Sequence, residues 1–553
     1  MSLVDYFPPG ATPRPEQTRL LEALGVALDD AERDPGAPRV LLVEAPPGVG
    51  KSHVAMALAR WSGDAYLLTS QRMLQDQYER EFGTELQLVK GRDNYVCERY
   101  PESRVPTSLG PCRRPRGPVC HCPYARAKAA ALAGPVFCTN TAYFATLRHW
   151  HSEQLRRRRL LIVDEAHNLE SQLVSVLTLR FSHDEMKRWF GAPLPRLASA
   201  DDYRPLLAHH LDRLAAQLAE VERAVEALQP AVDDGFDLTP PLTREEQELL
   251  AQRDELDSSV ARLRDFVDAP EREFILRYGD GPLAAFELLP LSITPMAADL
   301  LGDCADIAVL SSAYLGHRGV LAECFGVDEA DVRAVASPSP FAVEQRPIVY
   351  RPVGALSRAS LPRLEGALFA EVASLLAVHA RDKGLIHVSS YAVARRLVAD
   401  LALRAPREAP RLLFVESADA KARALEHHRA ARLPTVLVSP SLREGVDLPD
   451  DFLRFQIITK MPYPDLGDPW VAARKARDPR WYALETAKAL VQAYGRACRH
   501  ADDHGVTYVL DTNFGRFVQH YRPLLPRWFL DAASPALREH ADAVGAPVGD
   551  DFD

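Results

Sequence analysis

A short stretch near the N-terminus has the residue types that bind phosphate. "APPGVGKS", residues 45–52, follows the apolar run "RVLLVE" and precedes a stretch of small and apolar residues. This order predicts a strand, a tight loop and a helix, with backbone N–H groups of the loop turned towards a phosphate. Lys51 could then reach the β- and γ-oxygens of a nucleoside triphosphate, and Ser52 could ligate Mg²⁺. We therefore interpret the stretch as a phosphate-binding loop.

A pair of carboxylates follows another apolar run. In "RRLLIVDEAHNLE" the hydrophobic residues end at Asp164 and Glu165, and Asp164 lies 113 residues after Lys51. A carboxylate at the end of a strand can hold Mg²⁺ from the side opposite the phosphate loop, and a neighbouring glutamate can orient the attacking water. Together with the loop, the pair predicts hydrolysis of a nucleoside triphosphate.

Two arginines in the C-terminal third could complete such a site. Gln492, Arg496 and Arg499 of "QAYGRACRH" are spaced i, i+4 and i+7, so a helix would present all three on one side. The two arginine guanidiniums could contact a nucleotide that is held by another domain. The alternative interpretation is that the three residues form a solvated helix face. In "LREGVDLPDD", Gly445 and Asp447 follow the expected strand "PTVLVSP", at a sheet edge where ligands bind.

Four of the eight cysteines lie in residues 90–128, beside nine Lys/Arg and only three Asp/Glu. Cys97, Cys112, Cys120 and Cys122 have spacings of x14, x7 and x1. By themselves four thiolates suit Zn²⁺ and an iron–sulfur cluster equally well. The third ligand stays open, because His121 or Cys138 could replace Cys120. We interpret Cys138, in "GPVFCTNTAYF", as a buried strand residue, and the remaining cysteines as packing residues: Cys304, Cys324 and Cys498.

Composition limits the classes of protein to which the chain can belong. Its 553 residues are 47% hydrophobic and 26% charged, as expected for a soluble protein of several domains. No apolar run reaches the roughly 18 residues that a membrane span needs, and the N-terminus has no secretory signal pattern. We therefore expect a cytoplasmic protein with no membrane association, whose cysteines are not in disulfides.

The elements that must position these residues follow from periodicity. Strand-like runs such as "GLIHVSS", "RLLFVES" and "TVLVSP" alternate with helical patterns in the C-terminal part, which predicts a parallel sheet covered by helices. Residues 173–283 have helical periodicity, as in "HHLDRLAAQLAEVERAVEAL", and carry 22 Asp/Glu against 13 Lys/Arg. This acidic segment supplies most of the net charge of −10, so a basic surface elsewhere remains available for nucleic acid.

Taken together, these motifs resemble those of the iron–sulfur superfamily 2 DNA helicases typified by XPD and DinG, through nearly the whole chain. The matching phrases are, in chain order, "RPEQ", "APPGVGKS", "LLTSQRMLQDQ", "KGRDNYVC", "CPY", "VDEAHNL", "VLSSAYL", "LREGVDLPDD" and "QAYGRACRH". Ala45 replaces the usual first glycine of the phosphate loop, a form common in superfamily 2. "SSAYL", with Ser311 and Ser312, differs from the more usual Thr-Ser/Gly-Ala/Thr-Leu of the family, in which this motif has a coupling role.

The resemblance implies an α/β fold with two RecA-like P-loop motor domains, the first of which carries a [4Fe–4S] insert and a helical Arch-like insert. The implied boundaries are 1–89, 139–172 and 284–335 for the first motor domain, 90–138 for the iron–sulfur domain, 173–283 for the Arch-like insert and 336–553 for the second motor domain.

The resemblance also assigns roles to residues that match the motifs. Gln17 is implied to read adenine, Asp164 and Ser52 to hold Mg²⁺, Glu165 to orient the hydrolytic water, and Arg496 with Arg499 to approach the γ-phosphate. The other implied nucleotide-binding residues are Ala45, Pro46, Pro47, Gly48, Val49, Gly50, Lys51, His167, Asp447 and Gln492.

For the cysteines, the family places a [4Fe–4S] cluster here, with its first ligand matching Cys97 and its last matching Cys122; Cys112 and Cys120 complete the set. The implied activity is that of a DEAH-type, ATP-dependent 5′–3′ DNA helicase that acts as a monomer on single-stranded and forked DNA. Two alternatives remain. One is a DNA-stimulated translocase that remodels R-loops or protein–DNA complexes, and the other is an ATP-switched DNA-binding scaffold. The sequence identifies no protein partner.

Overall fold

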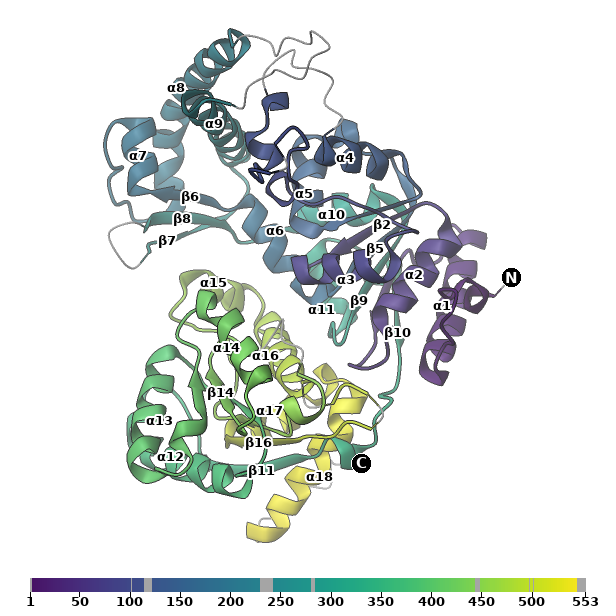
Figure 1. Ribbon diagram of the computed structural model, residues 1–553, viewed down its shortest axis with the longest axis vertical. Coiled ribbons are helices and arrows are strands. Elements are labelled where there is room, and N and C mark those ends of the chain that lie inside the picture. Colours follow the sequence, from purple (N-terminus) through teal and green to yellow (C-terminus); the bar gives the residue numbers. More distant parts are fainter. Residues whose placement is uncertain are drawn as a thin grey trace.

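Two parallel β-sheets organise the protein into an N-terminal and a C-terminal domain, which lie one above the other in Figure 1. The computed structural model describes residues 2–100, 102–113, 122–228, 242–279, 284–442, 448–496, 498–500 and 502–544. The main chain passes between the two sheets through residues 337–347, along one side of the molecule. The expected α/β class with parallel sheets is thus confirmed.

A seven-stranded parallel sheet forms the centre of the N-terminal domain. Its strands are, in spatial order, β10 (Val332–Ala336), β1 (Val40–Glu44), β9 (Ala305–Ser312), β5 (Arg158–Asp164), β2 (Ala65–Thr69), β4 (Val136–Asn140) and β3 (Gln87–Leu88). Alternate residues of β1 enter two different cores: Val40 and Leu42 enter one, and Leu41 and Val43 the other. The nearly continuous apolar runs in the sequence therefore mark strands that are covered on both faces.

Helices cover this sheet on both sides (Figure 1). They are α1 (Pro15–Arg33), α2 (Lys51–Ser62), α3 (Arg72–Phe82), α4 (Pro123–Ala133), α5 (Thr141–Trp150), α6 (Leu169–Leu177), α10 (Thr294–Gly302) and α11 (Arg318–Phe325). Because β1 and β5 run in the same direction within one sheet, the residues after Glu44 and after Asp164 emerge at the same edge. That edge is where the phosphate loop and the carboxylate pair meet.

The segment that we expected to be a helical insert, residues 173–283, contains strands as well as helices. Its long helices α8 (Ala200–Glu226) and α9 (Arg244–Asp268) pack together, but they stand on an antiparallel sheet that the sequence analysis missed. Its other elements are β6 (Leu179–Ser182), α7 (His183–Phe190), β7 (Phe274–Arg277) and β8 (Ala284–Pro290). The insert therefore extends past residue 283, because Phe286 of β8 stacks on Tyr203 of α8 with ring centroids 4.2 Å apart.

The C-terminal domain contains a six-stranded parallel sheet. Its strands are, in spatial order, β11 (Ile348–Gly354), β16 (Val506–Asp511), β15 (Phe455–Ile458), β12 (Gly384–His387), β14 (Val436–Ser439) and β13 (Leu412–Phe414). Its helices are α12 (Leu361–Val378), α13 (Tyr391–Arg404), α14 (Ala418–Ala430), α15 (Pro469–Arg477), α16 (Pro479–Tyr494), α17 (Asn513–His520) and α18 (Arg527–Val544). Within the described ranges, none of the protein's helices is long and apolar enough to cross a membrane.

The cysteine segment leaves the first sheet after β3 and returns through α4 to β4. A buried guanidinium anchors the return, since the Arg158 side chain is only 1% exposed and donates to the carbonyl end of α4. Its four backbone acceptors are Ala131, Leu132, Gly134 and Pro135, at 2.7–3.2 Å. Arg158 also pairs with Asp64 at 3.1 Å. The end of the segment is therefore fixed by β5 of the seven-stranded sheet.

Candidate functional site

The phosphate loop connects β1 to α2, as its sequence predicts. Gly48 and Gly50 have φ of +84° and +83°, a left-handed conformation that glycine adopts readily. Helix α2 begins at Lys51, so the free N–H groups of its first turn face the loop. The N–H of Ala45 donates to the carbonyl of Ser312 at 2.9 Å, which ties the start of the loop to the end of β9.

A cavity of about 900 Å³ lies between the loop and the C-terminal domain. The sequence-predicted residues that line it are Gln17, Pro47, Gly48, Gly50, Lys51, Ser52, Asp164, Glu165, His167, Gln492, Arg496 and Arg499. Ala45 and Val49 instead bury their side chains in the core of the domain, and Pro46 does not line the cavity. Gly445 and Asp447 lie outside the residues that the structure describes.

The two carboxylates are held in different environments. Glu165 Oε1 lies 3.4 Å from Lys51 Nζ, and its Oε2 lies 3.2 Å from His167 Nδ1. Although burial opposes ionisation, Lys51 and His167 hold the pKa of Glu165 below its usual range. Burial, together with the charge of Glu165, raises the pKa of Asp164 to about 6. A cation beside Asp164 would favour its ionised form, as expected for a carboxylate that ligates Mg²⁺.

Two residues whose roles the sequence did not establish position this pair. The hydroxyl of Tyr78, fully buried in α3, donates to Asp164 Oδ2 at 2.9 Å. Ser312 Oγ, at the end of β9, lies 2.8 Å from His167 Nδ1. The spacing of Tyr78 and Phe82 reads only as the apolar face of a helix, so the polar contact of Tyr78 had no sequence signal. The coupling role that the resemblance implies for the motif of Ser312 stays a prediction.

Gln17 contacts the phosphate loop. Its Nε2 donates to the carbonyl of Gly50 at 3.4 Å, and its Oε1 accepts from the N–H of Arg14 at 2.8 Å. The Arg14 guanidinium in turn donates to the carbonyl of Gly48 at 2.5 Å. The start of α1 therefore holds the loop from one side, and the expected reading of adenine by Gln17 stays a prediction.

The arginines of "QAYGRACRH" reach the cavity in a way that differs from the prediction. Helix α16 ends at Tyr494, so Gln492 is helical while Arg496 and Arg499 lie beyond the helix end. Gly495 follows directly, and the close approach favours glycine, because a Cβ atom there would lie 2.9 Å from Pro47 Cγ of the phosphate loop. The prediction of one helical face was wrong, yet all three side chains line the same cavity.

Phe341, in the linker of residues 337–347 between the two domains, also lies against the phosphate loop. A Cβ atom at Gly48 would overlap the ring of Phe341 and lie 3.2 Å from the carbonyl oxygen of Arg499. Phe341 is 6% exposed, so its ring fills the space beside the loop. The sequence offered no motif at Phe341, because its role depends on where the two domains meet.

The cysteine segment brings two of its predicted ligands together. The sulfur atoms of Cys97 and Cys112 both lie beside Gly110. A Cβ atom added at Gly110 would be 3.4 Å from Cys97 Sγ and 3.5 Å from Cys112 Sγ. Cys122 is buried at the N-cap of α4, where its sulfur accepts from the N–H of Ala125. Cys120 and His121 fall outside the described residues. Among the residues that are described, no group of three or more Cys, His, Asp or Glu is arranged as a metal site.

Cys138 lies in a different environment from Cys97, Cys112 and Cys122. Cys138 is fully buried in β4, within the core that also contains Leu67 and Ile162. Burial raises the pKa of its thiol far above the usual range, which disfavours the thiolate that a metal needs. The phrases at the two ends of the segment contact one another instead, since Arg92 lies over the ring of Tyr124 at 4.5 Å. Arg113 pairs with Asp254 of α9 at 2.6 Å, which joins the segment to the insert.

Comparisons of the sequence identify helicase relatives. The helicase C-terminal domain family matches residues 373–532. The ATP-dependent helicase DinG of Mycobacterium tuberculosis (strain H37Ra) is 29% identical over 481 residues, which cover 78% of this chain and 69% of that protein. A regulator of telomere elongation helicase 1 homolog from Caenorhabditis elegans is 30% identical over 125 residues, covering 20% of this chain and 12% of its own length.

Solved structures share the fold across both domains. An XPD helicase structure superposes with a TM-score of 0.60 at 15% identity, covering 93% of this chain and 98% of its own. The Xpd4 structure of S. tokodaii gives a TM-score of 0.54 at 14% identity, again covering 93% of this chain and 98% of its own. The fold similarity therefore includes the N-terminal domain as well as the part matched by the helicase C-terminal family.

Proposed function

We propose that this chain is an XPD/DinG-like superfamily 2 helicase that uses ATP to move 5′ to 3′ along single-stranded DNA and to separate forked duplexes. The observation that most directly supports the proposal is the cavity between the domains. Lys51 and Glu165 line it from the N-terminal domain, and Arg496 and Arg499 from the C-terminal domain. A site completed by two domains makes hydrolysis depend on their approach, and so on a strand that both domains grip.

The phosphate side of the site would bind the nucleotide. Lys51 and the backbone N–H groups of the loop face the place where the β- and γ-phosphates would lie. Ser52 and Asp164 supply hydroxyl and carboxylate oxygens, the donor type that Mg²⁺ prefers, so they would hold that ion. Bound Mg²⁺ neutralises charge on the phosphate oxygens. Tyr78 keeps Asp164 oriented towards the cavity.

The hydrolytic step would use residues from both domains, as in a DEAH-type ATPase. Glu165 would orient the attacking water, and its ionised state is favoured by Lys51 and His167. Arg496 and Arg499 would stabilise charge that develops on the γ-phosphate. Gln492 Nε2 lies 3.4 Å from His167 Nδ1, which links the arginine-bearing segment to the carboxylate segment.

The cysteine segment would hold a [4Fe–4S] cluster through Cys97, Cys112, Cys120 and Cys122. Support comes from the two sulfurs gathered around Gly110 and from the contact between the two ends of the segment. The cluster would fix a small basic element that has little apolar core of its own. With the α8–α9 insert as an Arch-like domain, joined to it through Arg113 and Asp254, this element would lie where a duplex is opened.

The protein would act as a cytoplasmic monomer on DNA. A translocase that remodels R-loops or protein–DNA complexes would use the same nucleotide site and would differ only in strand separation. The deciding experiment therefore compares unwinding of duplexes that carry a 5′ tail, a 3′ tail or a flap, together with DNA-stimulated ATP hydrolysis.

We expect the 5′-tailed and flap substrates to be unwound and the 3′-tailed duplex to remain intact. Lys51→Ala is the control, since it should abolish both hydrolysis and unwinding. Hydrolysis that DNA stimulates without any strand separation would favour the translocase, and a preference for the 3′ tail would contradict the proposed direction.

A further inference from the structure

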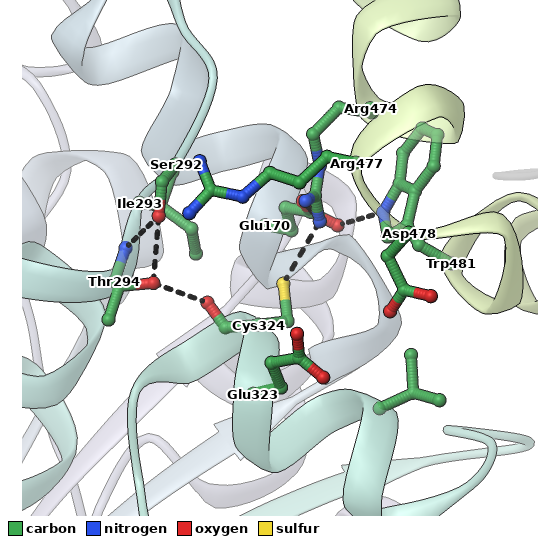
Figure 2. Close-up of a pocket in the computed structure, with 11 residues that line it drawn as sticks. Glu170, Ser292, Ile293, Thr294, Glu323, Cys324, Arg474, Arg477, Asp478 and Trp481 are labelled. Carbon is green, nitrogen blue, oxygen red and sulfur yellow. Dashed lines mark hydrogen bonds and ion pairs between the residues drawn. The ribbon is translucent and has the colours of Figure 1, made fainter. Parts of the chain in front are cut away.

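The two domains also meet away from the larger cavity, around a small cavity of about 50 Å³. Figure 2 shows Glu170 of α6 reaching towards Arg474 of α15 and Trp481 of α16, with Cys324 of α11 beside them. The N-terminal domain thus presents one acidic side chain to two residues of the C-terminal domain.

Both oxygens of Glu170 are used in this contact. Arg474 Nη2 donates to Oε1 at 2.8 Å, and the indole N–H of Trp481 donates to Oε2 at 2.8 Å. The Arg474 guanidinium lies over the Trp481 ring, 4.8 Å from its centroid. Exposure is only 8% for Glu170, 7% for Arg474 and 4% for Trp481. The geometry is therefore that of a buried, fully hydrogen-bonded carboxylate.

A buried pair of this kind responds sharply to the position of the domains. Removing one partner leaves an unpaired charge away from water, which is strongly destabilising, whereas an exposed pair contributes little. If α15 and α16 moved away from α6, water could solvate both groups, but small displacements would leave them neither paired nor solvated. The contact therefore favours one defined arrangement of the two domains.

The contact between Glu170, Arg474 and Trp481 lies close to the turn that follows Asp164 and Glu165. Glu170 is in the first turn of α6, which begins directly after the turn Ala166–Asn168 that contains His167. Helix α16 touches that turn as well, because Lys488 Nζ donates to the carbonyl of His167 at 3.4 Å. Trp481, Lys488 and Gln492 are spaced along one face of α16, so the helix follows the segment from Glu170 to the nucleotide cavity.

We propose that Glu170 is a positioning residue that couples the approach of the two domains to ATP hydrolysis. Glu170 holds α15 and α16 through Arg474 and Trp481. Arg496 and Arg499 follow the C-terminal end of α16 and line the larger cavity. Holding the helix would therefore restrict where these arginines lie relative to a bound γ-phosphate. This inference rests on the proposed ATPase activity, and it assigns to Glu170 a role beyond the nucleotide-contacting residues.

Glu170→Gln tests the proposal with little change in shape. The amide oxygen can still accept from Trp481, but the Arg474 charge loses its partner. We expect kcat for DNA-stimulated hydrolysis to fall by about tenfold or more, while KM for ATP stays within about twofold, because the phosphate loop is untouched. Unwinding should fall in parallel. The double variant Glu170→Gln/Arg474→Gln should be no worse than the single one, since no buried charge remains unpaired.

An exposed pair in the same interface provides the matched control. Arg480 of α16 pairs with Glu323 of α11, and these side chains are 60% and 63% exposed. Arg480→Gln should change kcat by less than about twofold. Thermal unfolding of each variant shows whether it is folded, and Arg474→Lys, which keeps the charge, should lose less activity than Glu170→Gln.

An unchanged kcat in Glu170→Gln, a loss confined to KM, or an equal loss in Arg480→Gln would overturn the role of Glu170. Failure of the proposed function gives a different result, because the unmodified protein would then show no DNA-stimulated hydrolysis at all.

Discussion

The nucleotide cavity and the cysteine segment both carry strong sequence motifs, but the fold holds them in different ways. The phosphate loop is fixed from several sides by Arg14, Phe341 and the end of β9. Cys97 and Cys112 gather around Gly110 among short turns. A site built at the ends of buried strands is positioned by the core, whereas a site built on turns depends on the ligand that it binds.

This difference predicts which changes stay local. Substitutions in the cavity should remove chemistry while leaving the fold intact, because the parallel sheets supply its rigidity. Substitutions of the cysteines should instead remove structure from the segment while leaving nucleotide binding largely intact.

The largest expected effect tests the cavity. Lys51→Ala and Glu165→Gln should each lower the rate of DNA-stimulated hydrolysis by about 10²- to 10³-fold or more, since they remove phosphate neutralisation and water positioning. Steady-state ATPase assays with single-stranded DNA measure this. Thermal unfolding should change little, and turnover close to that of the unmodified protein in either variant would refute the assignment of the site.

A large but selective effect is expected in the cysteine segment. Protein purified without oxygen should contain about four irons per chain, as in a Cys₄ cubane. Cys97→Ser or Cys122→Ser should lose this iron and lose unwinding, while ATP binding and much of the hydrolysis remain. Metal analysis and paired unwinding and ATPase assays measure the difference.

Cys138→Ser is the control for those variants. It should keep its iron and lose about 1–3 kcal/mol of stability, because the fully buried hydroxyl needs a hydrogen-bond partner. Loss of iron in Cys138→Ser, with retention in Cys120→Ser, would show that the ligand set is wrong at its third member.

A moderate effect is expected where the linker meets the phosphate loop. Gly48→Ala would place a Cβ atom in the Phe341 ring and would force alanine into a left-handed conformation that costs about 1–2 kcal/mol. KM for ATP should rise by roughly tenfold, as about 1.4 kcal/mol corresponds to that factor. Adding Phe341→Ala should restore part of the loss, and a double variant as impaired as the single one would exclude the steric explanation.

The smallest effect concerns Arg157, which belongs to neither site although its neighbour Arg158 anchors the cysteine segment. In "RRRR", residues 156–159, Arg157 pairs with Asp306 at 2.8 Å, with side chains about half exposed. Arg157→Ala should change stability by less than about 1 kcal/mol and leave the salt dependence of DNA binding unchanged. A reduced slope of affinity against salt concentration would mean that Arg157 contacts phosphate.

Much of this architecture could be predicted from the sequence, because its signals are local. Apolar runs that end in "APPGVGKS" and "VDEAH" identified two strands of the same sheet, β1 and β5, and the residues at their ends. The loop glycines and Lys51 lie as expected, and so do Asp164 and Glu165. Each motif is a short, continuous run of residues. Because the strands before the two motifs are parallel, the sheet places both motifs at the same edge.

The parts that were missed depend on contacts between distant segments. Tyr78 and Phe341 have no motif, since their roles come from packing against β5 and the phosphate loop. The helix that was expected to carry Arg496 and Arg499 ends at Tyr494, where Gly495 lies against Pro47 of the phosphate loop. The strands β6 and β8 pair across more than a hundred residues of sequence, so helical periodicity between them concealed the small sheet.

The buried guanidinium of Arg158 has a consequence for how the protein would survive exposure to air. Oxygen destroys solvent-accessible iron–sulfur clusters, and a protein that unfolds on losing its cluster cannot regain it easily. Here the carbonyl end of α4 accepts hydrogen bonds from Arg158 of β5, in a sheet whose core consists of apolar side chains. If the segment holds the proposed cluster, we therefore expect its exit to stay in place after oxidation, so that iron and sulfide could be reloaded onto a chain that has remained folded.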